Sequence, residues 1–148
     1  LLIMNKMAFI VQATVEGVTT YVKAGKHEFV IDEAKQMGGQ DLGANPLQMV
    51  LGALAACENV TARVVAKEMN FDLQDMTFVV KGQIDPRGFM GDPSARPYFE
   101  SVSVEVAVKT NESEERVQQL KEKVEARCPV YTMLKAAGVQ MNDQWYKA

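Results

Sequence analysis

Apolar and polar residues alternate along the first 31 residues in a way that predicts three short strands. Residues 8–15 are rich in β-branched side chains, and Gly17 follows them as a turn signal. Two further strand-like segments occupy residues 19–23 and 27–31. The pattern therefore predicts a three-stranded antiparallel meander, which a glycine-rich connection over residues 36–44 joins to the next element.

A long apolar segment predicts one helix from Pro46 to about Met69. Pro46 suits the first position of a helix, Asn45 suits its N-cap, and Asn70 offers an end. The first half is apolar on every side, which is typical of a buried helix rather than an amphipathic one. Because a chain of 148 residues seldom surrounds so long an apolar helix, we expect two copies of the chain to share this core.

Two longer strands are predicted over residues 71–85 and 98–110. In the second, every other residue from Val102 to Val108 is valine, which is the period of a half-buried strand. The segment between the strands, residues 87–97, contains arginine and aromatic side chains in a polar context. We interpret it as a long loop that serves as a lid or an interface arm.

The C-terminal part of the chain predicts two helices and a closing strand. Residues 111–127 form an amphipathic pattern, with Asn111 and Glu114 arranged as a capping box. Cys128 precedes a proline that opens a second, shorter helix, and residues 139–146 follow as a strand. The order βββ-α-ββ-αα-β predicts an α+β fold with antiparallel pairing.

The composition fits one globular domain over residues 1–148, in which residues 1–6 are an N-terminal tail. Hydrophobic residues make up 47% and charged residues 24%, and no apolar run is long enough to predict a membrane-spanning helix. The net charge of −3 argues against nucleic acid, which needs a basic face. The two cysteines and the lack of a secretory signal pattern indicate a cytoplasmic protein with reduced thiols. We expect neither nucleic acid nor a membrane as a partner.

The two cysteines are the strongest candidates for chemistry. Cys128 is predicted at a helix N-cap, where backbone N–H groups and the helix dipole stabilise a thiolate, and Arg127 adds a cation. Cys57 lies within the apolar helix, whose surroundings keep a thiol protonated. Electrostatics alone therefore predicts that Cys128 is the more acidic thiol. The alternative interpretation is that both cysteines are inert core residues.

Other kinds of site have little support in the sequence. One histidine and two cysteines are too few for a structural zinc site, so we expect no metal. His27 is interpreted as a surface or edge residue of its strand. The nine methionines are interpreted as core residues.

Two motifs give the chain a resemblance to the OsmC/Ohr family of small bacterial proteins. The first is the pattern Asn-Pro-x-x-x-Leu-x-Ala-Leu-x-Ala-Cys, which is present from Asn45 to Cys57 with its first leucine moved one place, to Leu51. The second is Cys128-Pro129-Val130, followed by a short helix and a final strand. The order of elements agrees with that family over residues 8–146.

The resemblance implies a fold, an assembly and an activity. The implied fold is an OsmC-like one, with antiparallel sheets wrapped around two long central helices in an intertwined homodimer. The implied activity is the reduction of organic hydroperoxides in defence against oxidative stress, with Cys57 as the peroxidatic and Cys128 as the resolving cysteine. These roles reverse the ranking by electrostatics. No cofactor is implied, and an external thiol reductant would restore both cysteines.

The chain departs from the family at the groups that activate the first cysteine. Family members use an arginine from the N-terminal region and a glutamate directly after Asn-Pro. Leu47 occupies the place of that glutamate, and no arginine precedes Arg63. Lys23 and Lys26 are poor substitutes for a bidentate guanidinium. The remaining candidate helpers are Glu58, Arg63, Arg87, Arg96 and Arg127.

These departures indicate a divergent branch and leave two functions open besides inert cysteines. The first is a thiol-dependent hydroperoxide reductase whose helper residues are rearranged. The second is a binding protein, or another thiol-dependent protein, with little peroxidase activity. Its pocket between subunits would hold a small apolar or thiol-bearing ligand.

Overall fold

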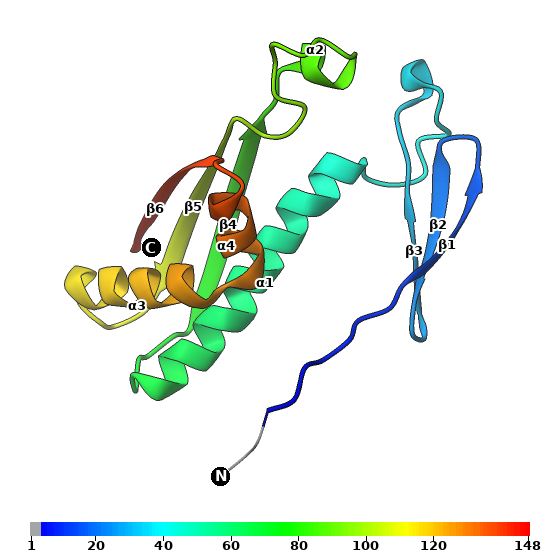
Figure 1. The fold of residues 1–148 in the computed structure, drawn as a ribbon. Helices are drawn as coiled ribbons and strands as arrows, with labels where there is room; N and C mark the ends of the chain where they lie inside the picture. The colour runs from blue at the N-terminus through cyan, green and yellow to red at the C-terminus, as the bar shows by residue number, and fades with distance from the viewer. Residues whose placement is uncertain (1–3) are drawn as a thin grey trace. The chain divides into compact units, whose positions relative to one another are not determined.

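The computed structural model describes residues 4–148, which divide into two compact units at Val50/Leu51 (Figure 1). The tail predicted over residues 1–6 lies partly outside the described residues, which exclude residues 1–3. Residues 4–11 form neither helix nor strand, so the first strand begins later than the predicted residue 8. Each unit is described by itself, and the single domain stays a prediction.

The N-terminal unit contains the predicted meander. Its three antiparallel strands are β1 (Gln12–Glu16), β2 (Thr19–Ala24) and β3 (His27–Ile31), paired in that order. Gly17 and Gly25 adopt φ angles of 61° and 62° in the two hairpin turns, a conformation that favours glycine. His27 is exposed at the start of the edge strand, as predicted.

Asp32 holds the glycine-rich connection against the end of β3. Its side chain is buried and accepts four hydrogen bonds, from the hydroxyl of Thr19 and from the backbone N–H groups of Glu33, Gln40 and Leu42. Burial alone would raise the pKa of Asp32, but the hydrogen bonds outweigh it and hold the pKa below its ordinary value. A short 3₁₀ turn, η1 (Lys35–Met37), lies within this connection.

The long helix α1 (Pro46–Glu68) begins and ends where the sequence predicts. Its N-terminus carries a reciprocal capping box, because the backbone N–H of Gln48 donates to Asn45 Oδ1 at 2.8 Å and the N–H of Asn45 donates to Gln48 Oε1 at 2.9 Å. At the other end, Asn70 adopts a φ of 50°, which stops the helix.

The C-terminal unit contains a second three-stranded sheet with the order β4-β5-β6. Its strands are β4 (Asp75–Gln83), β5 (Ser101–Lys109) and β6 (Gln140–Lys147). β4 and β5 pair antiparallel, but β5 and β6 pair parallel, so the prediction of antiparallel pairing is wrong for the last strand. The reason is the connection: α3 (Glu114–Arg127) and α4 (Pro129–Ala136) carry the chain back to the end of the sheet where β5 began.

Two details of the loops differ from the sequence-based expectation. The N-cap of α3 is Ser113 rather than Asn111, since Ser113 Oγ accepts the N–H of Arg116 at 3.1 Å. Glu112 instead accepts the backbone N–H of Asp72 at 2.9 Å, which ties the start of the helix to the loop before β4. The polar segment between β4 and β5 contains one helical turn, α2 (Pro86–Phe89).

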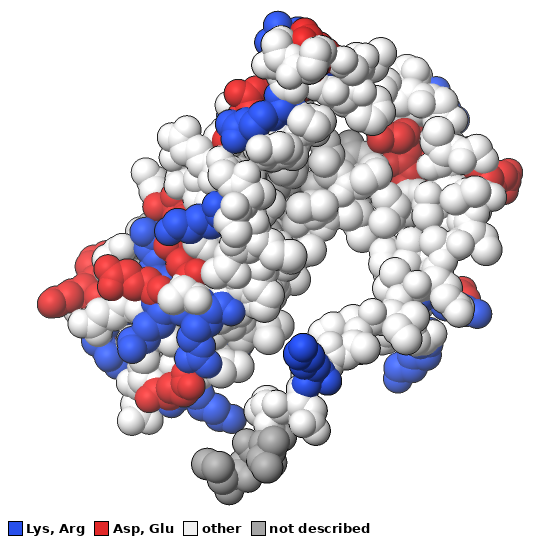
Figure 2. All heavy atoms as spheres, in the orientation of Figure 1, with Lys and Arg blue, Asp and Glu red and all other residues white. Residues whose placement is uncertain are grey.

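The core of this unit lies between the sheet and its helices, which Figure 1 shows on one side of the strands. The four valines of β5 from Val102 to Val108 are 0–1% exposed, in agreement with the predicted alternation. On α1, one face is buried through Leu54 and Val65, whereas Val60 is 64% and Val64 48% exposed. The described chain therefore covers only one face of this helix, and Figure 2 shows little charge over its first half.

By length and composition alone, α1 would also suit a membrane-spanning helix, so the expectation that no apolar segment is long enough is wrong. Core helices of soluble proteins can have the same length and apolar composition. Glu58 and Arg63 lie within the helix, and its buried face packs in the protein core. These observations favour a core helix.

Candidate active site

Cys57 and Cys128 lie near each other within the C-terminal unit, although they are far apart in the sequence. Cys57 is partly exposed on α1 and packs against the core, and Cys128 is fully buried at the junction of α3 and α4. Cys57 is one of the groups that perturb the Cys128 thiol, and neither cysteine is in a disulfide. The fold thus brings together the two thiols that the sequence singled out.

Cys128 is the N-cap of α4, as predicted, but it is not an acidic thiol. Its sulfur accepts the backbone N–H of Tyr131 at 3.5 Å, which favours the thiolate. Burial and the neighbouring Cys57 outweigh this bond and raise the pKa of Cys128 to about 12. The predicted acidity of Cys128 is therefore wrong. Arg127, the expected cation, is exposed and pairs with Glu68 instead.

The four candidate arginines are hydrogen-bonded to groups other than the thiols. Their partners are Leu73 O for Arg63, Asp85 for Arg87, Gly138 O for Arg96 and Glu68 for Arg127. Leu47, in the place of the family glutamate, is 40% exposed in the first turn of α1. Within residues 4–148, none of these hydrogen bonds joins an arginine to a cysteine. The activating role of each arginine therefore stays a prediction.

Glu58 is the candidate helper whose ionisation is changed most by its surroundings. It follows Cys57 on α1 and is 0% exposed, and neither carboxyl oxygen has a hydrogen-bond partner among the described residues. Burial, with the charges of Asp143 and Glu125, raises the pKa of Glu58 to about 8. The side chain is therefore mostly neutral at pH 7, where an ordinary glutamate is ionised.

Glu58 belongs to a buried acid cluster that we define as Glu58, Glu125, Tyr131 and Asp143. The hydroxyl of Tyr131 lies 2.7 Å from Asp143 Oδ2 and 3.3 Å from Glu125 Oε2. Burial and the charge of Asp143 raise the pKa of Glu125 to about 7. Lys121, whose Nζ lies 3.7 Å from Glu125 Oε1, opposes this shift. Among residues 4–148, no group of three His, Cys, Asp or Glu side chains is arranged to hold a metal ion.

Sequence reasoning missed three members of this cluster, although one signal was present. On β6, Met141, Asp143 and Trp145 share the face that turns toward the helices, so a carboxylate interrupts an apolar alternation. Glu125 directly follows Val124, which lies on the buried stripe of α3. A charged residue on a buried face usually has a partner or a function.

The family model described as OsmC-like protein matches residues 38–142, which is most of the chain. The chain belongs to the OsmC family. Solved structures agree in fold. An OsmC-like protein from Mycoplasma pneumoniae superposes with a TM-score of 0.85 at 18% identity, covering 98% of this chain and 99% of that one.

Two further structures carry names that refer to organic hydroperoxides. The organic hydroperoxide resistance protein OsmC from Legionella pneumophila has a TM-score of 0.75 at 18% identity and covers 97% of this chain and 99% of that one. OhrB of Bacillus subtilis, an organic hydroperoxide resistance protein, has a TM-score of 0.67 at 21% identity, with 94% and 98% covered. No curated protein matches the sequence. At these identities the structures show the fold of this OsmC-like protein and not its activity.

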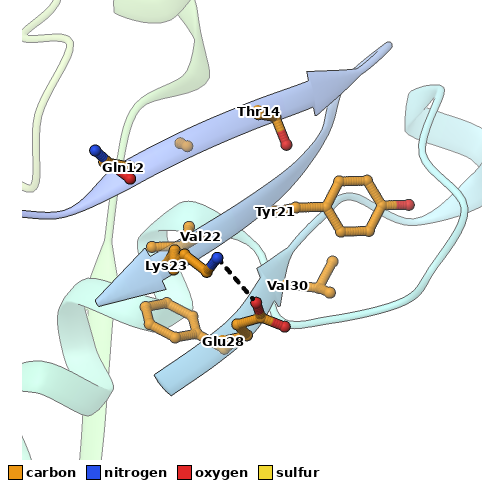
Figure 3. Close-up of a pocket in the computed structure, with 9 residues that line it drawn as sticks. Gln12, Thr14, Tyr21, Val22, Lys23, Glu28 and Val30 are labelled. Carbon is orange, nitrogen blue, oxygen red and sulfur yellow. Dashed lines mark ion pairs between the residues drawn. The ribbon is translucent and has the colours of Figure 1, made fainter. Parts of the chain in front are cut away.

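The N-terminal sheet of the OsmC-like protein carries a shallow pocket of about 430 Å³ (Figure 3). Tyr21, Phe29 and Val30 line it together with an ion pair between Lys23 and Glu28 at 3.6 Å. This pair is exposed and contributes little to stability. The lining contains no cysteine and no buried acid, so the pocket offers a surface for binding but no group for redox chemistry.

Proposed function

We propose that this OsmC-like protein reduces organic hydroperoxides, with Cys57 as the peroxidatic and Cys128 as the resolving cysteine. The observation that carries the proposal is the closeness of the two thiols, one partly exposed and one buried. A peroxidatic cysteine must meet its substrate, which fits the exposure of Cys57. A resolving cysteine must reach the oxidised sulfur without being oxidised first, which fits the burial and the raised pKa of Cys128.

The reaction needs only the two thiols and an external dithiol. Cys57 first loses its thiol proton, the thiolate attacks the terminal oxygen of the hydroperoxide, the O–O bond breaks, and the alkoxide takes up that proton and leaves as the alcohol. Cys57 is then a sulfenic acid. The Cys128 sulfur attacks the Cys57 sulfur, so that a disulfide forms and the sulfenic oxygen leaves as water. A dithiol exchanges with the disulfide, is itself oxidised to a disulfide, and restores both thiols.

We also propose that two chains form an intertwined homodimer. The support is the exposed apolar face of α1, which includes Val60 and Val64. A patch of this kind on a core helix favours burial against another surface. A second copy of the same chain is the partner that the family membership favours.

The test is turnover of cumene hydroperoxide with a dithiol reductant, compared with hydrogen peroxide. We expect the organic substrate to be preferred, because the thiols lie among apolar side chains of the core. Cys57→Ser should abolish turnover, whereas Cys128→Ser should consume about one equivalent and then stop. Ala126→Ser, on the exposed side of α3, is the matched control and should retain full activity. Unchanged turnover in Cys57→Ser would refute the mechanism.

A second candidate is a thiol-dependent or ligand-binding role with little peroxidase activity. Leu47 in the place of the family glutamate, and arginines hydrogen-bonded elsewhere, favour this candidate. It predicts that Cys57 reacts slowly with hydroperoxide even when the disulfide can form with other oxidants. Single-turnover oxidation of Cys57 in the Cys128→Ser variant distinguishes the two functions.

A further inference from the structure

The first turn of α4 holds the sulfur of Cys128. Cys128 is the N-cap of this helix, and its Sγ accepts the backbone N–H of Tyr131 at 3.5 Å. Two further bonds fix the backbone of Cys128, whose N–H donates to Val124 O at 2.8 Å and whose carbonyl accepts the hydroxyl of Thr132 at 2.9 Å. The placement of Tyr131 therefore sets the direction of the N–H that the sulfur accepts.

The side chain of Tyr131 extends from this turn to two other elements. It is 4% exposed, and its hydroxyl lies 2.7 Å from Asp143 Oδ2 on β6 and 3.3 Å from Glu125 Oε2 on α3. A buried aromatic ring needs no hydroxyl for packing, and a buried hydroxyl is costly unless it is hydrogen-bonded. The hydroxyl therefore anchors the first turn of α4 to the strand and the helix beside it.

Closure of the disulfide depends on where the Cys128 sulfur points and on how readily it loses its proton. Cys128 gives its proton to water, its sulfur bonds to the Cys57 sulfur, and the S–O bond of the sulfenic acid breaks, so that the departing hydroxide takes up a proton and leaves as water. The N–H of Tyr131 orients the attacking sulfur. It also favours the thiolate, because hydrogen bonds to charged acceptors are stronger than those to neutral ones.

We propose that Tyr131 is a positioning residue for disulfide closure. Its hydroxyl, held by Asp143 and Glu125, fixes the turn whose N–H orients the Cys128 sulfur. The proposal rests on the proposed function, since it assigns a residue to the second step of that reaction. It differs from a role in stability alone, because loss of the anchor slows a reaction of the folded protein.

The test follows disulfide closure without any peroxide. The reduced protein is treated with dipyridyl disulfide, which forms a mixed disulfide at the partly exposed Cys57 and releases one thiopyridone. The Cys128 sulfur then attacks the Cys57 sulfur, so that the Cys57–Cys128 disulfide forms and a second thiopyridone leaves with the proton of Cys128. Both releases are followed by absorbance. Cys128→Ser should show only the first release.

Tyr131→Phe keeps the ring and the backbone N–H but removes the anchor. We expect its second release to slow about 10-fold while the first is unchanged, since a misplacement of about 1 Å can cost on the order of 100-fold in rate. Gln118→Leu is the matched control, because it removes another bond to β6, from Gln118 Nε2 to Trp145 O at 2.8 Å, that does not involve α4. This control should keep the wild-type rate of second release. Equal rates in the wild type and Tyr131→Phe, or an equal loss in Gln118→Leu, would overturn the proposal.

A second pair of variants tests the anchor from β6 and keeps the proposal testable if Tyr131→Phe does not fold. Asp143→Ala removes the acceptor 2.7 Å from the hydroxyl and should slow the second release, whereas Asp143→Asn keeps an oxygen acceptor and should restore most of the rate. The losses of Asp143→Ala and Tyr131→Phe should not add in the double variant, because both break one contact. An equal loss in Asp143→Ala and Asp143→Asn would overturn the proposal. If closure follows expectation but hydroperoxide is not consumed, the peroxidase function fails and the role of Tyr131 stands.

Discussion

The hydroxyl of Tyr131 at the start of α4 lies 2.7 Å from Oδ2 of Asp143 on β6, and this contact joins the crossover helices to the strand that follows them. We expect Tyr131→Phe to lower the free energy of unfolding by about 1–3 kcal/mol, because partly buried carboxyl oxygens of Asp143 and Glu125 lose their partner. Urea denaturation measures this loss. Tyr21→Phe, on the exposed meander, is the matched control and should change stability little; an equal loss in both variants would contradict the prediction.

The stability of the protein should depend on pH through the buried acid cluster. The folded state raises the pKa of Glu58 to about 8 and that of Glu125 to about 7, so between pH 5 and 8 it binds more protons than the unfolded chain. Stability is then greatest near the acidic end of this window and falls as the pH rises through the folded pKa values. The free energy of unfolding should fall by an amount on the order of a few kcal/mol over this window, and by much less in Glu58→Gln. Denaturation at several pH values tests it, and a rise in stability from pH 5 to pH 8 would contradict it.

Mild oxidation should join Cys57 to Cys128 within one chain. The closeness of the two thiols is the physical reason, since a disulfide needs Cα atoms that lie, or can be brought, within about 7 Å of each other. Intact mass after treatment with one equivalent of hydroperoxide should show the loss of two hydrogen atoms per chain. Cys128→Ser should instead gain oxygen at Cys57. Stepwise gain of oxygen in the wild-type protein, without a disulfide, would count against the pairing.

Leu47→Glu should leave the oxidation rate of Cys57 unchanged, because the sequence contains no N-terminal arginine for the new carboxylate to hold. Leu47 is 40% exposed, so the charge does not meet the cost of deep burial. Near the positive end of α1 it should instead stabilise the helix by roughly 0.3–1 kcal/mol. Rapid-mixing oxidation in the Cys128→Ser background is the measurement. A clear gain in rate would show that another cation occupies the place of that arginine.

The protein should behave as a dimer at micromolar concentration. Light scattering is expected to give twice the mass of the chain, and Val60→Lys should weaken the assembly, because Val60 belongs to the exposed apolar face of α1. Gln119→Lys adds the same charge on the exposed side of α3 and serves as the control. A folded wild-type monomer under these conditions would rule out the intertwined homodimer.

Local signals in the sequence were enough to predict most of the elements. The glycine turns of the meander, the Asn45 cap of α1 and the Cys128 cap of α4 each depend on a few neighbouring residues, and the structure confirms all three. The direction of β6 could not be predicted in this way, because either edge direction suits the same alternation of residues. The N-cap of α3 could not be predicted from neighbouring residues either. The hydrogen bond from the backbone N–H of Asp72 to the Glu112 carboxylate fixes where that helix starts.

The chemistry of the candidate site was harder to predict than its location. The motifs identified both cysteines, but the acidity of Cys128 depends on burial by residues distant in the sequence, which outweighs the local cap. The charge of Glu58 likewise depends on Asp143 and Glu125, which no local pattern connects to it. Ionisation in a protein core is a property of the tertiary structure, so the local residue types alone predicted the wrong direction for the pKa of Cys128.

The position of β6 along the chain makes the acid cluster near the thiols a late product of synthesis. Asp143, whose charge helps to keep Glu58 protonated, lies on the strand that the ribosome adds after α1, α3 and α4. A growing chain that ends before residue 140 has both cysteines but lacks the strand that completes the buried acid cluster. During translation the thiol pair therefore lacks the neighbouring carboxyl group of Asp143, and the buried acid cluster is complete only once β6 has joined β5.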